Sequence, residues 1–93
     1  MKGFAILPLL VVGALVSTSV IAAPQCTDAA RDKWLPEATI KQQIVDSGYT
    51  IDVFKVSGNC YEIYGKDAKG QKVEIYFDPT DGRIVKQRGG GKS

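Results

Sequence analysis

The sequence predicts an α+β fold, in which one helix packs on an antiparallel β-meander of three or four strands. Apolar residues recur at helical spacing over residues 36–47, which indicates one amphipathic helix. After Gly48 the pattern changes to short segments rich in β-branched and aromatic residues, separated by turn sequences. Two cysteines, one before the helix and one after it, predict a disulfide that ties the N-terminal segment to the sheet.

The first 22 residues have the pattern of a secretory signal peptide. Lys2 is the only charged residue before Asp28, an apolar stretch follows it, and small residues end that stretch. Cleavage after Ala22 keeps Pro24 away from the cut, and cleavage after Ala23 is the alternative. We expect an exported protein, periplasmic or secreted, with no membrane span after signal removal. The apolar stretch is shorter than the ~20 residues that a span needs, so a retained anchor is the less favoured alternative.

The rest of the chain is expected to form one small domain. We assign residues 23–33 to an N-terminal segment, residues 34–88 to the domain itself, and residues 89–93 to a flexible glycine-rich tail. The net charge of the whole chain is +2, and loss of Lys2 with the signal would leave +1. A net charge this small does not provide the basic surface that nucleic-acid binding needs, so we expect no nucleic-acid partner.

The N-terminal segment carries the first cysteine. Cys26 and Cys60 are predicted to form a structural disulfide in an oxidising compartment. A redox-active pair is the alternative, disfavoured because the two lie too far apart for a CxxC motif. Thr27 is expected to cap a short helix or an ordered turn that leads to Trp34, which helps to seal the core.

The main helix has recognisable ends. Pro36 fits its first position. Gly48 is expected to end it in the left-handed conformation, with Tyr49 packing back on Ile44. The apolar stripe of the helix consists of Ile40, Ile44 and Val45.

Four strands are expected after the helix, at residues 50–56, 60–66, 71–78 and 83–87. A three-residue loop with Gly70 in the left-handed position sets the register of the middle hairpin. The apolar pairs then share the core face, with Ile63 opposite Ile75, Tyr61 opposite Phe77, and Gly65 opposite Val73. A slip by one residue would mix the two faces, which burial of one face forbids. The next turn sets Phe77 opposite Ile84, again on the core face.

The first hairpin is less determined by the sequence. A turn at Gly58 and Asn59 pairs Phe54 with Ile63. Ile51 and Val53 would then need a bulge to face inward.

The outer face of the middle hairpin carries the candidate binding residues. These are Glu62, Tyr64, Glu74 and Tyr76, with Lys66 and Lys72 at the rim. Tyrosine is enriched at interfaces because its ring is apolar and its hydroxyl is polar, which favours a binding surface. A structural face is the alternative, stabilised by cross-strand pairs or covered by residues 26–34. An edge strand that accepts a partner's strand is a second binding route.

Few residues in the sequence could carry catalysis. The chain has no histidine, which removes the usual general base and the commonest metal ligand. Asp78 and Asp81 lie at a turn, where aspartate ordinarily caps backbone amides. Calcium binding at residues 78–82 is the alternative, but the segment is shorter than an EF-hand loop. We therefore assign no catalytic, metal-binding or cofactor-binding residue and expect a protein that is not an enzyme.

The sequence resembles the PepSY domain family over about residues 34–88. The resemblance is carried by Gly48 and Tyr49 at the helix end, residues 60–64, residues 73–79 with their final Asp-Pro, and Gly82. It implies a PepSY/cystatin-like fold and no catalytic residues. It also implies an accessory or binding module in the bacterial periplasm, whose partner is a peptidase or a membrane complex of the envelope. A small-ligand or metal-binding sensor is the alternative; without histidine, the chain is not expected to ligate haem.

Overall fold

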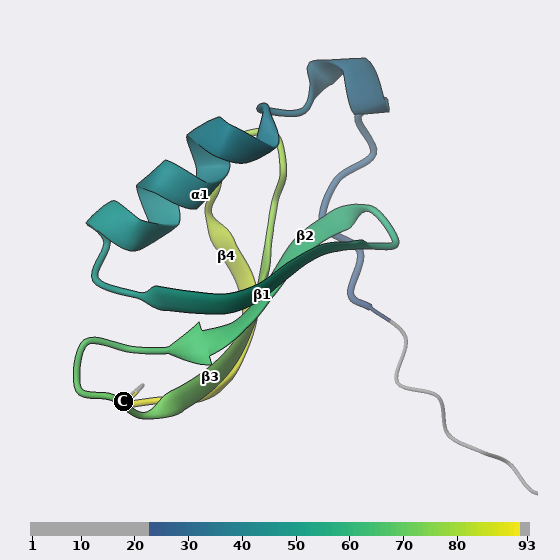
Figure 1. Cartoon of the computed structure of the whole chain (residues 1–93). Helices are drawn as coiled ribbons and strands as arrows, with labels where there is room; N and C mark the ends of the chain where they lie inside the picture. Colours follow the sequence, from purple (N-terminus) through teal and green to yellow (C-terminus); the bar gives the residue numbers. More distant parts are fainter. Residues whose placement is uncertain (1–22, 92–93) are drawn as a thin grey trace, which may run out of the picture.

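One helix lies across one face of a four-stranded antiparallel sheet, which confirms the predicted α+β class (Figure 1). The computed structural model describes residues 23–91, so the predicted signal peptide lies outside the described residues. The elements are the 3₁₀ turn η1 (Arg31–Lys33), the helix α1 (Glu37–Asp46) and the strands β1 (Thr50–Ser57), β2 (Cys60–Lys66), β3 (Lys72–Phe77) and β4 (Ile84–Gly89).

The ends of α1 follow from local hydrogen bonds. Pro36 is the cap residue just before the first helical turn, and its carbonyl accepts from the backbone N–H of Ile40 at 3.1 Å. At the other end Gly48 has φ +103°, which only glycine adopts without strain. The backbone N–H of Gly48 donates to the carbonyl of Val45, and that of Tyr49 donates to the carbonyl of Ile44. These two bonds form the Schellman motif and confirm the predicted end of the helix.

The segment before α1 is a series of turns. The Thr27 hydroxyl oxygen accepts from the backbone N–H of Ala29 at 3.0 Å, so Thr27 caps a turn and not the 3₁₀ turn that follows. Trp34 packs its ring edge-on against Tyr61, with the ring centroids 5.3 Å apart. The Tyr61 hydroxyl in turn donates to the carbonyl of Leu35 at 2.7 Å. These contacts hold the entry to the helix against the sheet, as predicted.

The strands pair in chain order, β1-β2-β3-β4. The predicted registers of the middle hairpin and of Phe77 opposite Ile84 are both present. The core between helix and sheet consists of Ile40, Ile44, Tyr61, Ile63, Val73, Ile75 and Phe77. This alternation leaves the odd-numbered residues of β2 facing the helix and the even-numbered ones facing outward.

A bulge interrupts the pairing of β1 with β2, in the hairpin that the sequence left undetermined. Ile51 pairs with Gly65, and after the shift Val53 pairs with Tyr64. The bulge therefore turns Ile51 toward the core, where it packs on the core cluster. The expectation that Val53 also faces inward is wrong, because Val53 shares the outer face with Tyr64 and is 48% exposed.

Two residues predicted for the core are largely exposed. Val45 of the helix stripe is 50% exposed, and Ile84 of β4 is 44% exposed. An α-helix is about 10–12 Å wide, whereas four strands spaced about 4.8 Å apart span about 14 Å, so α1 cannot cover the whole sheet. An open groove of about 510 Å³ remains beside β4, with Ile44 and Ile84 among its lining residues.

Adding a methyl group at Gly65 is expected to destabilise the domain. A Cβ atom at this buried position would overlap the carbonyl oxygen of Thr50 in β1, and backbone cannot move aside as a flexible side chain can. Gly65→Ala should therefore lower the free energy of unfolding by about 1–3 kcal/mol, measured by urea denaturation. The exposed Gly91→Ala is the control and should change stability by less than about 0.5 kcal/mol. A loss below about 0.5 kcal/mol in Gly65→Ala as well would show that the β1 backbone shifts to make room for the methyl group.

Candidate functional site

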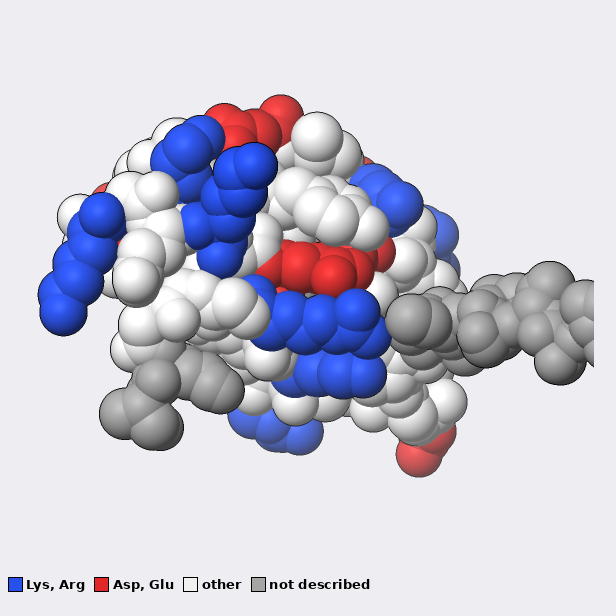
Figure 2. All heavy atoms as spheres, turned by 90° about the horizontal axis from the view of Figure 1, so that it is seen from below, with Lys and Arg blue, Asp and Glu red and all other residues white. Residues whose placement is uncertain are grey.

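The sheet face away from α1 is hollowed at its centre. Figure 2 views this face and shows acidic atoms at its middle with basic side chains next to them. The outer-face hollow has a volume of about 330 Å³ and is lined by Ala23, Lys55, Ser57, Glu62, Tyr64, Glu74, Tyr76 and Arg88. All four residues predicted for the binding face are therefore brought together.

These four residues differ in exposure, however. Tyr64 is 41% exposed, whereas Glu62 is 1% and Tyr76 is 5% exposed. Glu74 lies between these extremes, with its side chain 20% exposed. The predicted face is thus part open surface and part buried floor, and the alternative of a covered floor holds for Glu62 and Tyr76.

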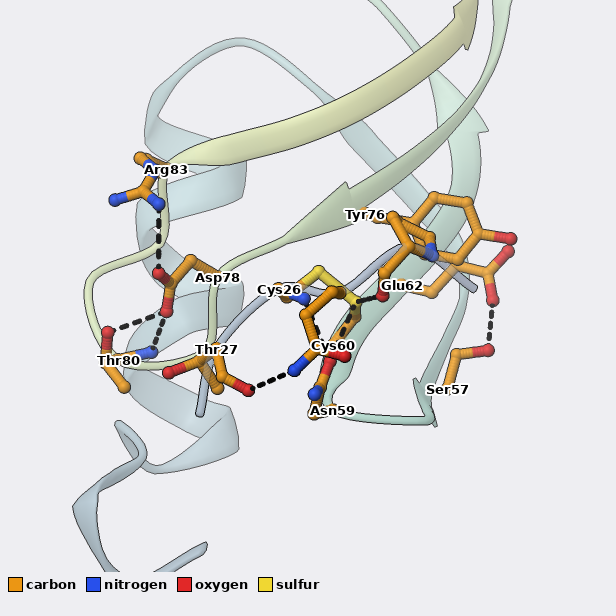
Figure 3. Close-up of a disulfide and its surroundings, with 12 residues drawn as sticks. Cys26, Thr27, Ser57, Asn59, Cys60, Glu62, Tyr76, Asp78, Thr80 and Arg83 are labelled. Carbon is orange, nitrogen blue, oxygen red and sulfur yellow. Dashed lines mark hydrogen bonds and ion pairs between the residues drawn. A yellow bond between two sulfur atoms is a disulfide. The ribbon is translucent and has the colours of Figure 1, made fainter. Parts of the chain in front are cut away.

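The cover over this floor is the N-terminal segment. The predicted Cys26–Cys60 disulfide is formed, and the backbone N–H of Cys26 donates to Asn59 Oδ1 at 2.9 Å (Figure 3). In Figure 1 the blue segment runs down past the end of the β1–β2 hairpin. Cys60 begins β2 on the outer side, so its disulfide holds the segment against Tyr76, with Ala23 packed beside them.

The two carboxyl groups of the hollow have different partners. The Ser57 hydroxyl donates to Glu62 Oε1 at 2.8 Å, while Glu62 Oε2 is buried and has no hydrogen-bond donor within residues 23–91. The Tyr76 hydroxyl donates to Glu74 Oε2 at 3.1 Å, and the Arg88 guanidinium lies 3.7 Å from Glu74 Oε1. Glu62 is therefore the group whose environment is incomplete.

These contacts shift the pKa values of Tyr64, Glu74 and Tyr76 in the outer-face hollow. The Glu62 side chain, which can donate to Glu74 only when it carries a proton, followed by the Tyr76 hydroxyl and the charge of Arg88, lowers the pKa of the Glu74 carboxyl despite its partial burial. Burial, followed by the bond to Glu74, raises the pKa of Tyr76 to about 12. The charge of Glu62 raises the pKa of the Tyr64 hydroxyl. Both shifts are upward from an ordinary pKa of 10.0 at which tyrosine is already neutral at physiological pH.

The aspartates at the turns serve the backbone. Asp78 is buried, and its Oδ1 accepts from the backbone N–H of Thr80 at 2.8 Å and from the Thr80 hydroxyl at 2.6 Å. Its Oδ2 lies 3.5 Å from the Arg83 guanidinium. Within residues 23–91, no group of three or more His, Cys, Asp or Glu side chains is placed to hold a metal ion. The Asp78 carboxylate is engaged by internal partners, which is the turn-capping role expected for it.

The family of the chain follows from its sequence match. The model of the family described as peptidase propeptide and YPEB domain matches residues 6–88. The chain belongs to the PepSY family. The resemblance noted from the residues is thereby confirmed, and a PepSY domain fits a non-catalytic module. No curated protein and no solved structure matches the chain. Within residues 23–91, this PepSY domain has no helix that is long and apolar enough to cross a membrane.

Proposed function

We propose that the chain is an exported PepSY module that binds another envelope protein through the open part of its outer face. Export is supported by the signal-like residues 1–22 and by a disulfide, which suits an oxidising compartment. The description of the family names peptidase propeptides, so a peptidase of the envelope is the partner class that we favour. Nothing in the hollow supplies a histidine or a thiol for catalysis, which fits a binding role.

One row of side chains across the sheet carries this proposal. Val53, Tyr64, Glu74 and Arg88 lie side by side on the outer face, one from each strand. The row presents an exposed valine, an exposed tyrosine, and a carboxylate paired with a guanidinium. The Lys55 ammonium lies 5.5 Å from the centroid of the Tyr64 ring and flanks it. Apolar, aromatic and charged groups in one row match the composition of protein interfaces.

Truncation of Tyr64 is expected to weaken partner binding strongly without unfolding the domain. An exposed aromatic side chain at an interface centre often contributes 2 kcal/mol or more, which is about 30-fold in affinity. The test is capture by the tagged mature protein from its native envelope extract, with partners identified by mass spectrometry. Tyr64→Ala should lose a partner that the wild type and Val45→Ala both retain, because Val45 is an apolar residue of similar exposure (50% against 41%) on the helix side of the domain.

Tyr76→Ala is unsuitable for this test, because Tyr76 is buried against the disulfide and its loss would disturb the fold. Loss of capture in Val45→Ala alone would move the binding surface to the exposed side of α1. Capture that survives both substitutions would indicate a strand edge. If no partner is captured, a small ligand becomes the better candidate, since the hollow is near the lower size limit of ligand pockets. A thermal-shift screen would then identify it.

A further inference from the structure

Glu62 has a buried oxygen without a hydrogen-bond donor. The side chain is 1% exposed, and Ser57 satisfies only its Oε1. Glu62 Oε2 has no donor within residues 23–91, and Glu62 is among the residues that line the outer-face hollow. A buried carboxylate oxygen is costly unless it is hydrogen-bonded or paired with a charge. The structure therefore points to a missing donor at this oxygen.

The basic side chains that line the hollow interact with groups other than Glu62. The Arg88 guanidinium is paired with Glu74, and the Lys55 ammonium lies over the Tyr64 ring. The Tyr76 hydroxyl donates to Glu74. None of these charged or titratable groups donates to Glu62 Oε2. The neighbouring Glu74 carboxyl can hydrogen-bond with Glu62 only while one of the two carries a proton, so a fully ionised pair needs a donor from elsewhere around the hollow.

Ala23 is the one residue of the N-terminal segment that lines the hollow. It is held there by its neighbours: the Pro24 carbonyl oxygen lies 3.1 Å from Cys60 Sγ, and Cys26 is bonded to Cys60. Ala23 also packs against the cluster formed by the disulfide and Tyr76. Of the two predicted cleavage sites, after Ala22 and after Ala23, the first is favoured because the second would place Pro24 at the cut, and it makes Ala23 the first residue.

We infer that signal removal converts Ala23 into the new N-terminus and that its α-ammonium group binds the Glu62 carboxylate in the outer-face hollow. Cleavage replaces one neutral amide N–H by a charged group with three donors, which suits an unpartnered carboxylate oxygen. The ion pair would lock the N-terminal segment onto the sheet only after processing. The inference rests on the proposed export and adds an internal ligand to the same site.

The experiment compares two forms of the mature chain, one with a free α-amino group at Ala23 and one with that group acetylated. The pKa of the α-amino group, followed by NMR, should rise by about one unit above its ordinary 7.7–8.0, because an opposite charge favours the charged form. Glu62→Gln should return the pKa to its ordinary value while keeping an acceptor for Ser57. Glu37→Gln removes a carboxylate on α1 and should leave the raised pKa unchanged.

The pH dependence of stability gives a second readout. A raised folded pKa contributes stability that is present below the unfolded value of about 7.7–8.0 and is lost as the pH rises through the folded value. The free chain should show this loss as a falling melting temperature in that window, and the acetylated chain should not. An ordinary α-amino pKa, an equal shift in Glu62→Gln, or identical pH curves would overturn the inference. A proton shared between Glu62 and Glu74 would produce that outcome.

The outcomes also separate this inference from the proposed function. The chain can be produced to begin at Ala23, so the pKa measurement needs no export. A raised pKa with no Tyr64-dependent partner would overturn the binding proposal alone, whereas an ordinary pKa with such a partner would overturn the inference alone. The mass of the protein recovered from the envelope gives the third test. A chain that keeps residues 1–22, or that begins at any residue other than Ala23, would overturn the maturation step.

Discussion

Replacing Cys26 and Cys60 together by serine is expected to lower the free energy of unfolding by roughly 3–4 kcal/mol. The disulfide links residues separated by 34 positions, and closing a loop of this length removes that much chain entropy from the unfolded state. A domain of ~70 residues has a total stability of roughly 4–10 kcal/mol. The disulfide therefore accounts for a large share of the stability of the PepSY domain.

Urea denaturation of the double-serine variant measures this loss directly. Reduction of the wild-type protein should produce the same loss, because both treatments open the same loop. A loss below about 1 kcal/mol in both experiments would mean that the N-terminal segment is held by its other contacts, such as the bond from Cys26 to Asn59. A loss seen only in the serine variant would point to the serines themselves.

Ile63→Ala is expected to destabilise the domain by about 2–5 kcal/mol, enough to leave much of the protein unfolded at 37 °C. Ile63 is fully buried at the centre of the core, paired with Phe54 on β1 and with Ile75 on β3. Truncation leaves a cavity in the core between the sheet and α1. The measurement is the midpoint of thermal unfolding together with urea denaturation.

Val53→Ala provides the matched control for Ile63→Ala. It also truncates a branched side chain in the sheet, but Val53 is 48% exposed on the outer face. Its loss should cost less than about 1 kcal/mol. If both substitutions cost the same, the sheet and not the helix-facing core would determine stability.

The sheet register could be predicted because local signals agree. Gly70 and the loop around it fix the middle hairpin, and burial of one face rejects a slipped alignment. The Gly58–Asn59 turn did the same for Phe54 and Ile63. The sequence did not locate the bulge in β1, because Ile51 and Val53 are both apolar and either could face the core.

The exposure of the candidate site was harder to predict. Alternation shows which residues share a face, but it does not show which segment covers that face. The N-terminal segment has no periodic pattern, so the burial of Glu62 and Tyr76 had no direct signal in their own strands. One signal was available: Cys60 has the same parity in β2 as Glu62 and Tyr64, so its disulfide had to lie on the outer side.

The sequence also did not predict how much of the sheet α1 covers. Val45 fits the apolar stripe of α1, and Ile84 has a core residue as its pairing partner. Ile84 is exposed because one helix is narrower than four strands, and Val45 is exposed because it lies a rotation of about 100° around the helix from the buried Ile44. The periodicity of a helix shows which of its residues are apolar on one side, but it does not show how wide the sheet is on which that side packs.

The order of the strands has a consequence for how fast the domain folds. Each strand pairs with its neighbour in the chain, so every hairpin closes through a short loop and no strand waits for a distant partner. Small domains with such local contacts fold faster than those whose strands pair across long separations. A chain that emerges unfolded on the far side of a membrane would thus form its sheet before the disulfide joins Cys26 to Cys60. Oxidation would then cross-link a sheet that has already formed. Because the sheet forms fast, the chain would spend little time as an unfolded, protease-sensitive coil.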